Sequence, residues 1–313
     1  MRRKLLAIAA MLSLIMAACG GNDSGSSVSD TTVAGETTAT IAARDGTSAA
    51  EKTTETIAIP AGSSVEAIKK KGKITIGVKF DVPLFGVKNP TTNGIEGFDV
   101  EIGKIIARNI FGENIDGKVE FVEAVSKNRE PFIQESKVDL VISTYTINAT
   151  RKEVVDFAGP YYVAGQDILV KKGNASISGV ADLKGKKVCS VAGSTSLKNV
   201  QEKAPQVDVS SVFDKYSLCI EALKDGRVEA VTTDDIILLG FVAADPANLK
   251  LVGKPFTQEP YGIGLKKGDT ALRAFVNDVL DQSYADGAWS KAFEATIGES
   301  GISAPKPPAI DRY

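Results

Sequence analysis

Histidine is absent from this chain of 313 residues, and its absence excludes several kinds of chemistry. Ser-His-Asp and Cys-His catalysis, histidine-ligated zinc and imidazole pH switching all need that ring. Aromatic residues are few, with 12 Phe, 7 Tyr and 1 Trp, which disfavours an aromatic platform for carbohydrates. The glycine-rich phosphate-binding loop of ATPases is also lacking. We therefore expect no ATP hydrolysis, no cofactor and no bound metal ion.

An excess of one charge is lacking too. Lys and Arg number 37 against 39 Asp and Glu, which leaves a net charge of −2. Hydrophobic residues make up 43% of the chain, as in ordinary folded proteins. The composition therefore predicts a globular protein of two lobes or domains that does not bind nucleic acid.

Long apolar runs are scarce, and the most apolar one lies at the start of the chain. Basic residues at 2–4 precede an uncharged, mostly apolar run at 5–18, which is shorter than a membrane span of about 20 residues. Small residues then lead into Cys19. This segment resembles a bacterial lipoprotein signal, in which the cysteine becomes the lipid-modified first residue. The resemblance implies a signal peptide over 1–19 and a lipid anchor on Cys19, at the extracytoplasmic face of the cell membrane.

Cysteines number only 3. If Cys19 carries lipid, then Cys189 and Cys219 remain as an even pair in an oxidising compartment. We expect a disulfide between them, with two buried free thiols as the alternative.

The distribution of small and polar residues divides the chain. Residues 20–62 are rich in Ser, Thr, Gly and Ala, so they are expected to form a flexible tether. The proline-containing end at 301–313 is expected to form a flexible tail. Between them we expect lobe 1 over 63–165 and 258–300, and lobe 2 over 166–257.

Strand-like and helix-like segments alternate between the tether and the tail. This rhythm predicts an α/β fold in which each lobe is a mostly parallel sheet flanked by helices, with two crossover strands near 159–170 and 255–265. Strands are expected at 73–79, 118–124, 138–144, 186–192, 207–213 and 227–233. Helices are expected at 98–111, 131–137, 195–203, 217–226, 235–243, 270–289 and 290–298, the last two returning to lobe 1.

Ligands of such sheets bind beyond the carboxyl ends of the strands. That rule selects polar side chains which directly follow predicted strands and could converge on one cleft. These are Lys79, Thr144, Thr146, Ser194, Thr195 and Asp234.

Two charged residues near these strand ends suit the two groups of an amino acid. Thr150 has the spacing of a capping box with Glu153, so we expect it to start a helix whose first turn contains Arg151. The guanidinium fork of arginine matches a carboxylate, although an exposed surface arginine is the plainer alternative. Asp234 could accept from an ammonium group or act as an ordinary N-cap, and Asp235 is the more ordinary helix-start residue.

A longer set of motifs resembles one family. STYTINATRKEVVDFAGPYY (143–162) occurs with GFDVEIGK (97–104), KVDLVIS (137–143), GSTS (193–196) and GRVEAVTTDD (226–235). Together they resemble the polar amino-acid-binding receptors of ABC importers, which are bacterial extracellular solute-binding proteins of family 3 with the type II periplasmic-binding-protein fold. The resemblance implies a ligand-binding receptor and not an enzyme.

The resemblance also implies roles for single residues. Arg151 would clamp the α-carboxylate with help from the amides of Ser194 and Thr195, and Asp234 would hold the α-ammonium. The other implied contacts to the α-groups are the backbone at Ser143 and Thr144 and the side chain of Thr146.

The ligand's side chain is expected to be acidic. SKNRE (126–130) is similar to the glutamate/aspartate-binding branch, in which Arg129 would meet the distal carboxylate and Tyr216 would donate a hydroxyl. Counting Lys79, Arg129 and Arg151 against Asp234 gives a net charge of +2, which suits a dicarboxylic amino acid. We therefore expect glutamate, or else aspartate, with Lys79 and Arg129 as ordinary exposed charges being the alternative.

The expected mechanism is capture by closure of the two lobes, followed by delivery to a membrane permease that a separate ATPase drives. The receptor is expected to act as a monomer. A receptor that signals to a membrane sensor is a rival reading. A dehydratase on the same fold is another, and it would need an unpaired cleft carboxylate as general acid. The candidates for that acid are Glu123, Glu130 and Asp81.

Overall fold

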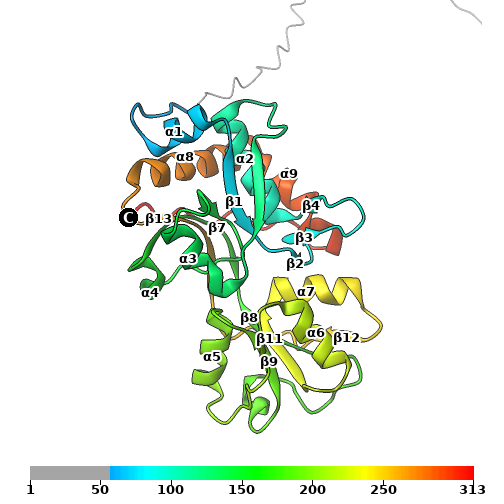
Figure 1. The fold of residues 1–313 in the computed structure, drawn as a ribbon. Coiled ribbons are helices and arrows are strands. Elements are labelled where there is room, and N and C mark those ends of the chain that lie inside the picture. The colour runs from blue at the N-terminus through cyan, green and yellow to red at the C-terminus, as the bar shows by residue number, and fades with distance from the viewer. Residues whose placement is uncertain (1–56) are drawn as a thin grey trace, which may run out of the picture. The chain divides into compact units, whose positions relative to one another are not determined.

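The computed structural model describes residues 57–313 of the chain. The predicted signal segment, Cys19 and most of the tether lie outside the described residues, so the lipid anchor stays a prediction. From residue 57 on, strands and helices alternate and build two α/β lobes, each around its own five-stranded sheet (Figure 1).

The first lobe has a mixed sheet that is parallel on one side and antiparallel on the other. In order across the sheet the strands are β5 (Val119–Glu123), β1 (Ile74–Val78), β6 (Leu140–Val141), β13 (Glu259–Lys266) and β7 (Val155–Ala164). β1 pairs in parallel with β5 and β6, whereas β13 is antiparallel to β6 and β7. A small antiparallel sheet follows β1, made of β2 (Asp81–Val82), β3 (Gly86–Lys88) and β4 (Ile95–Glu96).

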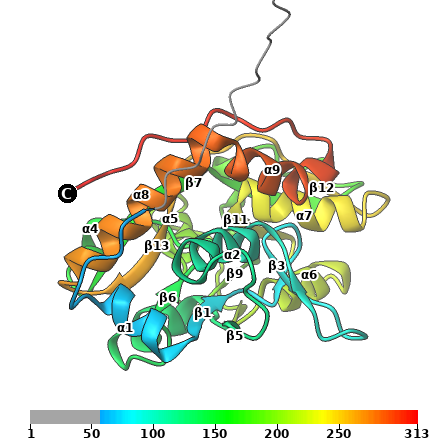
Figure 2. The ribbon, with the colours of Figure 1, turned by 90° about the horizontal axis from the view of Figure 1, so that it is seen from above.

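Helices cover this sheet in Figures 1 and 2, and two of them come from the end of the chain. They are α1 (Ser64–Lys71), α2 (Phe98–Phe111), α3 (Arg129–Gln134), α4 (Ala149–Lys152), α8 (Thr270–Asp286) and α9 (Ala288–Glu294), with the short 3-10 turns η1 (Ser126–Asn128) and η3 (Ile297–Ser300). The Phe98 ring meets the rings of Trp289 and Phe293 edge to face, with centroids 5.6 and 5.8 Å apart. The final helices therefore return to the first lobe, as the sequence predicts.

The second lobe repeats the plan over the middle of the chain. Its strands are β10 (Val212–Phe213), β9 (Val188–Val191), β11 (Ala230–Asp234), β8 (Gln166–Lys171) and β12 (Leu249–Leu251) in order across the sheet. β9 is parallel to β10 and β11, and β8 is antiparallel to β11 and β12. Its helices are α5 (Thr195–Lys203), α6 (Tyr216–Lys224) and α7 (Asp235–Ala244), with a 3-10 turn η2 (Val180–Leu183).

The chain passes between the two sheets twice, as predicted. It leaves the first sheet from β7 into β8 and returns into β13. The two crossovers are joined by hydrogen bonds, since the Gln166 N–H donates to Thr257 Oγ1 at 3.0 Å and the Phe256 N–H donates to the Gln166 carbonyl at 2.9 Å. The lobes are therefore linked by two adjacent, bonded segments.

Several predicted elements differ in extent. The strands expected at 138–144 and 207–213 shorten to Leu140–Val141 and Val212–Phe213. Thr144, the last residue of the first of these predicted strands, has a positive φ of 43°, which lies outside the extended region that a strand needs. The helices expected at 98–111 and 195–203 are confirmed with those bounds.

The expected cap at Thr150 is wrong. The Asn148 side chain accepts the Arg151 N–H at 2.9 Å and caps α4, so Thr150 lies inside the helix. Asn is as good an N-cap as Thr or better, and it comes two residues earlier in the chain.

The tail at 301–313 contains no helix or strand beyond a turn, but it is attached to the first lobe. The Asp311 N–H donates to the Gly159 carbonyl at 2.8 Å, Lys152 pairs with Asp311 at 2.9 Å, and the Phe157 N–H donates to Tyr313 Oη at 2.9 Å. Figure 2 shows this segment running past α8 toward α4. These contacts differ from the free tail that its proline content predicts.

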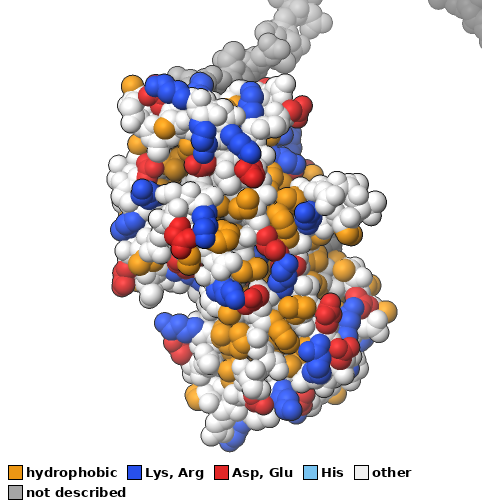
Figure 3. Space-filling view, in the orientation of Figure 1, with side chains coloured by type: hydrophobic (Ala, Val, Ile, Leu, Met, Phe, Trp, Pro, Cys, Tyr) orange, Lys and Arg blue, Asp and Glu red, His pale blue; other side chains and the backbone are white. Residues whose placement is uncertain are grey.

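The surface carries charges of both signs. In Figure 3 blue and red side chains alternate over the visible face without a large patch of one sign, in keeping with the net charge of −2. Among residues 57–313, every helix falls short of the length or the apolar character that a bilayer crossing requires.

The expected disulfide is confirmed. Cys189 on β9 is bonded to Cys219 on α6, with an S–S distance of 1.95 Å and a Cα–Cα distance of 5.6 Å. Both cysteines are fully buried. The bond therefore ties α6, which bears Tyr216, to the centre of the second sheet.

Replacing both cysteines by alanine should lower the free energy of unfolding by about 3 kcal/mol, because a cross-link over 30 residues restricts the unfolded chain. Urea denaturation of the region 57–313 measures the loss. Dithiothreitol should destabilise the wild type to a similar degree and leave the double variant unchanged. Equal stability of the two proteins without reductant would contradict the expectation.

Candidate ligand-binding site

The candidate residues lie beyond the carboxyl ends of strands in both sheets. In the first lobe, Lys79 follows β1, and three residues follow β6, namely Ser143, Thr144 and Thr146. In the second lobe, Ser194 and Thr195 lie at the start of α5, and Asp234 ends β11. The other three candidates lie on helices: Arg129 on α3, Arg151 on α4 and Tyr216 on α6. The charged ones are buried, with exposed fractions of 2% for Lys79 and Arg129, 7% for Arg151 and 3% for Asp234. The alternative of ordinary surface charges is therefore excluded for these side chains.

Residues of the two lobes meet at Gly193. The guanidinium groups of Arg129 and Arg151 both donate to the Gly193 carbonyl, at 3.2 and 3.0 Å. Thr146 Oγ1 and Thr195 Oγ1 lie 3.4 Å apart across the same boundary. Thr146 and Thr195, which were selected because they follow predicted strands, are therefore in contact.

Two ion pairs border this contact. Lys127 pairs with Asp214 at 2.7 Å, and Lys215 pairs with Glu123 at 2.5 Å. Each joins a residue near α3 to the segment before α6. Both are partly exposed and therefore worth little singly, but each joins the first lobe to the second.

Arg151 keeps donors for an anion. Its Nε pairs with Glu130 at 3.1 Å, and its Nη1 donates to the Thr146 carbonyl at 2.7 Å. Burial, with the neighbouring Arg129 cation, lowers the pKa of Arg151 to about 10, so the group remains a cation at neutral pH. With the bond to Gly193, three of its five N–H groups are used, and two remain for a carboxylate.

Arg129 is more completely occupied. Its Nε donates to the Ser126 carbonyl at 3.1 Å, and its Nη1 donates to the carbonyls of Ser143 and Thr144, both at 3.1 Å. With the bond to Gly193, four of its five N–H groups are used. Its predicted role as the clamp for a distal carboxylate stays a prediction and rests on one remaining donor.

Lys79 is the least compensated cation of the site. Its ammonium donates to Ser126 Oγ at 2.8 Å and lies 6.0 Å from the centre of the Tyr216 ring. Within residues 57–313 it has no carboxylate at ion-pair distance. Burial, helped by the Arg129 cation, lowers the pKa of Lys79 to about 7.

Asp234 lies in the second lobe, and in the part of the chain that the structure describes no cation is at ion-pair distance from it. Its carboxylate accepts from Tyr261 Oη at 2.6 Å and from Ser196 Oγ at 3.4 Å. Burial and the nearby Glu259 charge raise the pKa of Asp234 to about 7. α7 begins at Asp235, and the Asp234 side chain makes no cap bond there, so the alternative of an ordinary N-cap does not explain it.

The hydroxyls beside these groups are already oriented. Tyr216 Oη accepts from Thr233 Oγ1 at 2.6 Å, and burial raises the pKa of Tyr216 to about 12, so its hydroxyl stays protonated. Ser194 Oγ accepts the Leu197 N–H at 3.0 Å and caps α5. The Ser194 N–H donates to the Val191 carbonyl at 3.3 Å, so both the hydroxyl and the amide of Ser194 are engaged within the second lobe.

The charge count made from the sequence was incomplete, because it missed three buried or half-buried carboxylates. Glu130 pairs with Arg151. Asp99 and Glu259 are also buried, and each affects the pKa of a site residue, Lys79 in one case and Asp234 in the other. Asp99 and Glu130 lie in motifs recognised in the sequence, GFDVEIGK and SKNRE, but neither was counted among the charges of the cleft.

The rival reading as a dehydratase loses its candidate acids. Glu123 and Glu130 both have cation partners, and the Asp81 carboxylate accepts the Ser217 N–H at 3.1 Å. An acid catalyst in the cleft would need a carboxyl group free to give up its proton to a substrate.

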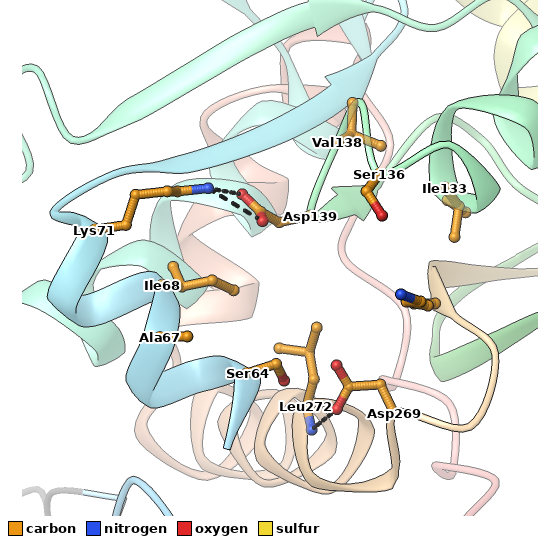
Figure 4. A pocket seen from close by; sticks show the side chains of 11 residues that line it. Ser64, Ala67, Ile68, Lys71, Ile133, Ser136, Val138, Asp139, Asp269 and Leu272 are labelled. Carbon is orange, nitrogen blue, oxygen red and sulfur yellow. Dashed lines mark hydrogen bonds and ion pairs between the residues drawn. The ribbon is translucent and has the colours of Figure 1, made fainter. Parts of the chain in front are cut away.

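One cavity opens at these residues, and another lies away from them. One of about 560 Å³ opens at the site and is lined by Thr146, Arg151, Gly193, Thr195 and Glu259 among others. The other, of about 230 Å³, lies between α1, α3 and α8 and is bordered by the Lys71–Asp139 ion pair (Figure 4). None of the candidate residues lines this second cavity.

Two α/β lobes joined by two crossovers, with cations and a carboxylate buried where the lobes meet, define a bilobal receptor for a small charged ligand. Comparison with known proteins agrees. The bacterial extracellular solute-binding proteins of family 3 match residues 74–299, and this chain belongs to that family.

Several relatives share most of their length with this chain. The glutamine-binding protein of an ABC transporter of Bacillus subtilis is 45% identical over 237 residues, which cover 75% of this chain and 85% of that protein. The glutamate-binding protein of Corynebacterium efficiens is 37% identical over 246 residues, which cover 76% and 83%.

Solved structures show the same fold. An ancestral arginine-binding protein bound to glutamine has a TM-score of 0.67 and 41% identity, covering 72% of this chain and 98% of its own. The receptor for L-cysteine of Neisseria gonorrhoeae has a TM-score of 0.71 and 32% identity, covering 79% and 98%. The expected type II periplasmic-binding-protein fold is confirmed. The chain is a non-enzymatic, extracytoplasmic solute-binding receptor of an ABC importer for amino acids.

Gly193→Ala should weaken amino-acid binding about tenfold or more. A Cβ at this position would lie 2.6 Å from Lys127 Cα and 2.8 Å from its nitrogen, so the lobes could not close fully. Gly253→Ala is the matched control, because its φ of 77° equals the 76° of Gly193 within a degree and nothing lies within 4 Å of the added Cβ. Calorimetric titration of both variants measures the effect, and equal losses of affinity would refute the steric explanation.

Proposed function

We propose that this receptor captures an acidic amino acid, glutamate or else aspartate, and delivers it to its permease. One observation carries the choice of ligand. The Lys79 ammonium is buried in the cleft with a hydroxyl and an aromatic ring as its neighbours, and within the described residues it has no carboxylate partner. A buried unpaired cation is costly, and a ligand carboxylate would compensate it.

The α-groups of the ligand would be shared between the lobes. Arg151 has two further N–H groups for the α-carboxylate, and the Thr195 amide at the start of α5 would assist it; the Ser194 amide would have to leave the Val191 carbonyl, to which it donates at 3.3 Å, to do the same. Asp234 would accept from the α-ammonium, with Thr146 and the backbone of Ser143 and Thr144 as further contacts. A ligand that bridges the lobes binds the closed form better than the open form, so it favours closure.

The distal group of the ligand would then point toward Lys79. Tyr216 is a protonated hydroxyl on the same side, and Arg129 has one N–H left. A distal carboxylate would accept from all three groups, whereas a carboxamide would leave the Lys79 charge uncompensated.

Glutamine is a second candidate, favoured by two observations. Relatives at 45% and 44% identity are glutamine-binding proteins. In addition, Glu130 and Glu259 lower the positive charge of the cleft below the count made from the sequence. With a lowered pKa, Lys79 is partly neutral at pH 7 and is then compatible with a neutral ligand.

The lipid anchor on Cys19 and the preceding signal segment complete the proposal. They would hold the receptor at the outer face of the membrane beside the permease. Signalling to a membrane sensor would use the same ligand site and the same closure.

Lys79→Met should decide between the two ligands. Loss of the ammonium should raise the dissociation constant for glutamate about tenfold or more, because the distal carboxylate loses a charged hydrogen bond. Glutamine affinity should change much less. Lys203→Met on the exposed end of α5 is the control for a general loss of charge. If both ligands lose affinity equally in Lys79→Met, or if only glutamine binds the wild type, the acidic assignment fails.

The affinity ratio of glutamate to glutamine should fall as the pH rises above about 7. In the ligand-free protein the pKa of Lys79 is about 7, and a bound carboxylate raises it, so glutamate binding takes up a proton in that window. The charged groups that act on Lys79 are Arg129, Asp81, Asp99 and Arg151. The contribution of Asp234 is common to both ligands and cancels in the ratio.

Calorimetry between pH 6 and 9 (about the range in which both ligands keep their charges) tests this dependence. Lys79→Met should make the ratio independent of pH. A ratio that stays constant in the wild type would show that Lys79 does not contact the distal group.

A further inference from the structure

Asp99 is a buried carboxylate beside the site that contacts no proposed ligand group. It lies in the first turn of α2 and is 0% exposed. Its Oδ1 accepts from Tyr161 Oη at 2.5 Å, and its Oδ2 accepts the Thr144 N–H at 2.9 Å. Within residues 57–313 it takes part in no ion pair.

Helix stabilisation does not explain this burial. An acidic residue in a first helical turn is favourable while it remains at the surface, and Glu101 in the same turn does so, paired with Lys104 at 2.7 Å. Asp99 instead points into the lobe, where removal of a carboxylate from water is costly. A further role has to offset that cost.

The residue that Asp99 holds is in a strained conformation. Thr144 is β-branched, and its φ of 43° lies in the left-handed region, which is unfavourable for such a residue. The Asp99 carboxylate fixes the N–H of Thr144, and Arg129 fixes its carbonyl at 3.1 Å. Hydrogen bonds therefore fix both the N–H and the carbonyl of Thr144.

This turn directs the loop that follows β6. Arg129 also binds the Ser143 carbonyl at 3.1 Å, and Arg151 binds the Thr146 carbonyl at 2.7 Å. A relaxed Thr144 would move these carbonyls and with them both guanidinium groups. The conformation of Thr144 thus determines where the cations of the site point.

Tyr161 connects the same carboxylate to the crossover region. It lies on β7, is fully buried, and its carbonyl accepts from Trp289 Nε1 at 2.9 Å. Its ring and hydroxyl therefore have a fixed place, and they fix one oxygen of Asp99. The other oxygen is then aimed at Thr144.

We propose that Asp99, oriented by Tyr161, is a positioning residue that holds the loop at 143–146 in its ligand-binding conformation. It acts on the contacts to the α-groups, so its loss should weaken the binding of every amino acid by a similar factor. This inference rests on the proposed function of the loop and not on whether the ligand is glutamate or glutamine.

Protonation of Asp99 gives the proposal a spectroscopic signature. Burial raises the pKa of Asp99 to about 7, although the donors Tyr161 and Thr144 and the cations Lys79 and Arg129 oppose that rise. The Thr144 amide donates directly to the carboxylate. Its NMR cross-peak should therefore move with pH in the ligand-free protein, with a midpoint near 7.

Asp99→Asn tests the proposal, with Glu101→Gln as the matched control in the same helical turn. We expect Asp99→Asn to raise the dissociation constants of glutamate and glutamine by the same factor, about tenfold, and to abolish the pH-dependent shift of the Thr144 amide. Glu101→Gln should change neither. Tyr161→Phe keeps the carboxylate but frees one of its oxygens, so it should weaken both ligands equally but by a smaller factor.

Several results would overturn the proposal. Wild-type affinity in Asp99→Asn together with a lower melting temperature would show a role in stability alone. Unequal losses for the two ligands would show a direct contact to the ligand's side chain. If Asp99→Asn does not fold, Tyr161→Phe gives the same comparison of the two ligands.

Failure of the proposed ligand would be visible separately. Wild-type protein that binds neither glutamate nor glutamine would refute the proposed function. The pH shift of the Thr144 amide, and its loss in Asp99→Asn, would still report on the contact between Asp99 and the loop. The equal-factor test would then be applied to whichever amino acid a thermal-shift screen identifies.

Discussion

Two arginine side chains lie against one tyrosine ring, and the site depends on how their charges are held. The guanidinium carbons of Arg129 and Arg151 are 4.4 and 4.8 Å from the centre of the Tyr145 ring, close enough for cation–π attraction. Like charges this near repel each other, and burial together with the Arg129 charge lowers the pKa of Arg151. Backbone carbonyls and Glu130 offset that repulsion, and the Gly193 carbonyl does so from the opposite lobe.

This shared carbonyl couples ligand binding to the arrangement of the lobes. Arg129 and Arg151 belong to the first lobe, and Gly193 lies just before α5 in the second lobe. Glycine is required there because of its positive φ and the approach of the Lys127 backbone. The two lobes therefore meet through main-chain atoms, and a bound amino acid adds bridges between groups that are already close.

The charges of the cleft are divided unequally between the lobes. The first lobe contributes Lys79, Arg129 and Arg151, and the second contributes Asp234. An α-amino acid has its carboxylate and ammonium on one carbon, so it can satisfy both lobes only when they are close together. Affinity and closure are then two results of the same electrostatic arrangement.

The spacing and type of the residues were enough to predict most strands and helices from the sequence. α2 has the predicted bounds because its apolar residues recur with helical spacing along the whole element. The inner strands β1, β6, β9 and β11 are almost wholly buried, as expected of strands inside an α/β sheet. The cap of α4 was misplaced because Asn148 and Thr150 both have capping side chains, and only the course of the preceding loop decides between them. The strand ending near Thr144 was predicted too long for a related reason, since its positive φ is imposed by Asp99 and Arg129.

Local pattern by itself determined the alternation of strands and helices, the pairing of the two cysteines and the position of polar residues after strands. These features depend on neighbours within a few turns of chain, or on a count. Only the tertiary structure decided that Glu130 pairs with Arg151, that Asp99 holds Thr144 and that the Lys79 ammonium donates to Ser126. Those contacts join residues 20 to 50 positions apart, and their energies depend on burial, which no local stretch of sequence specifies.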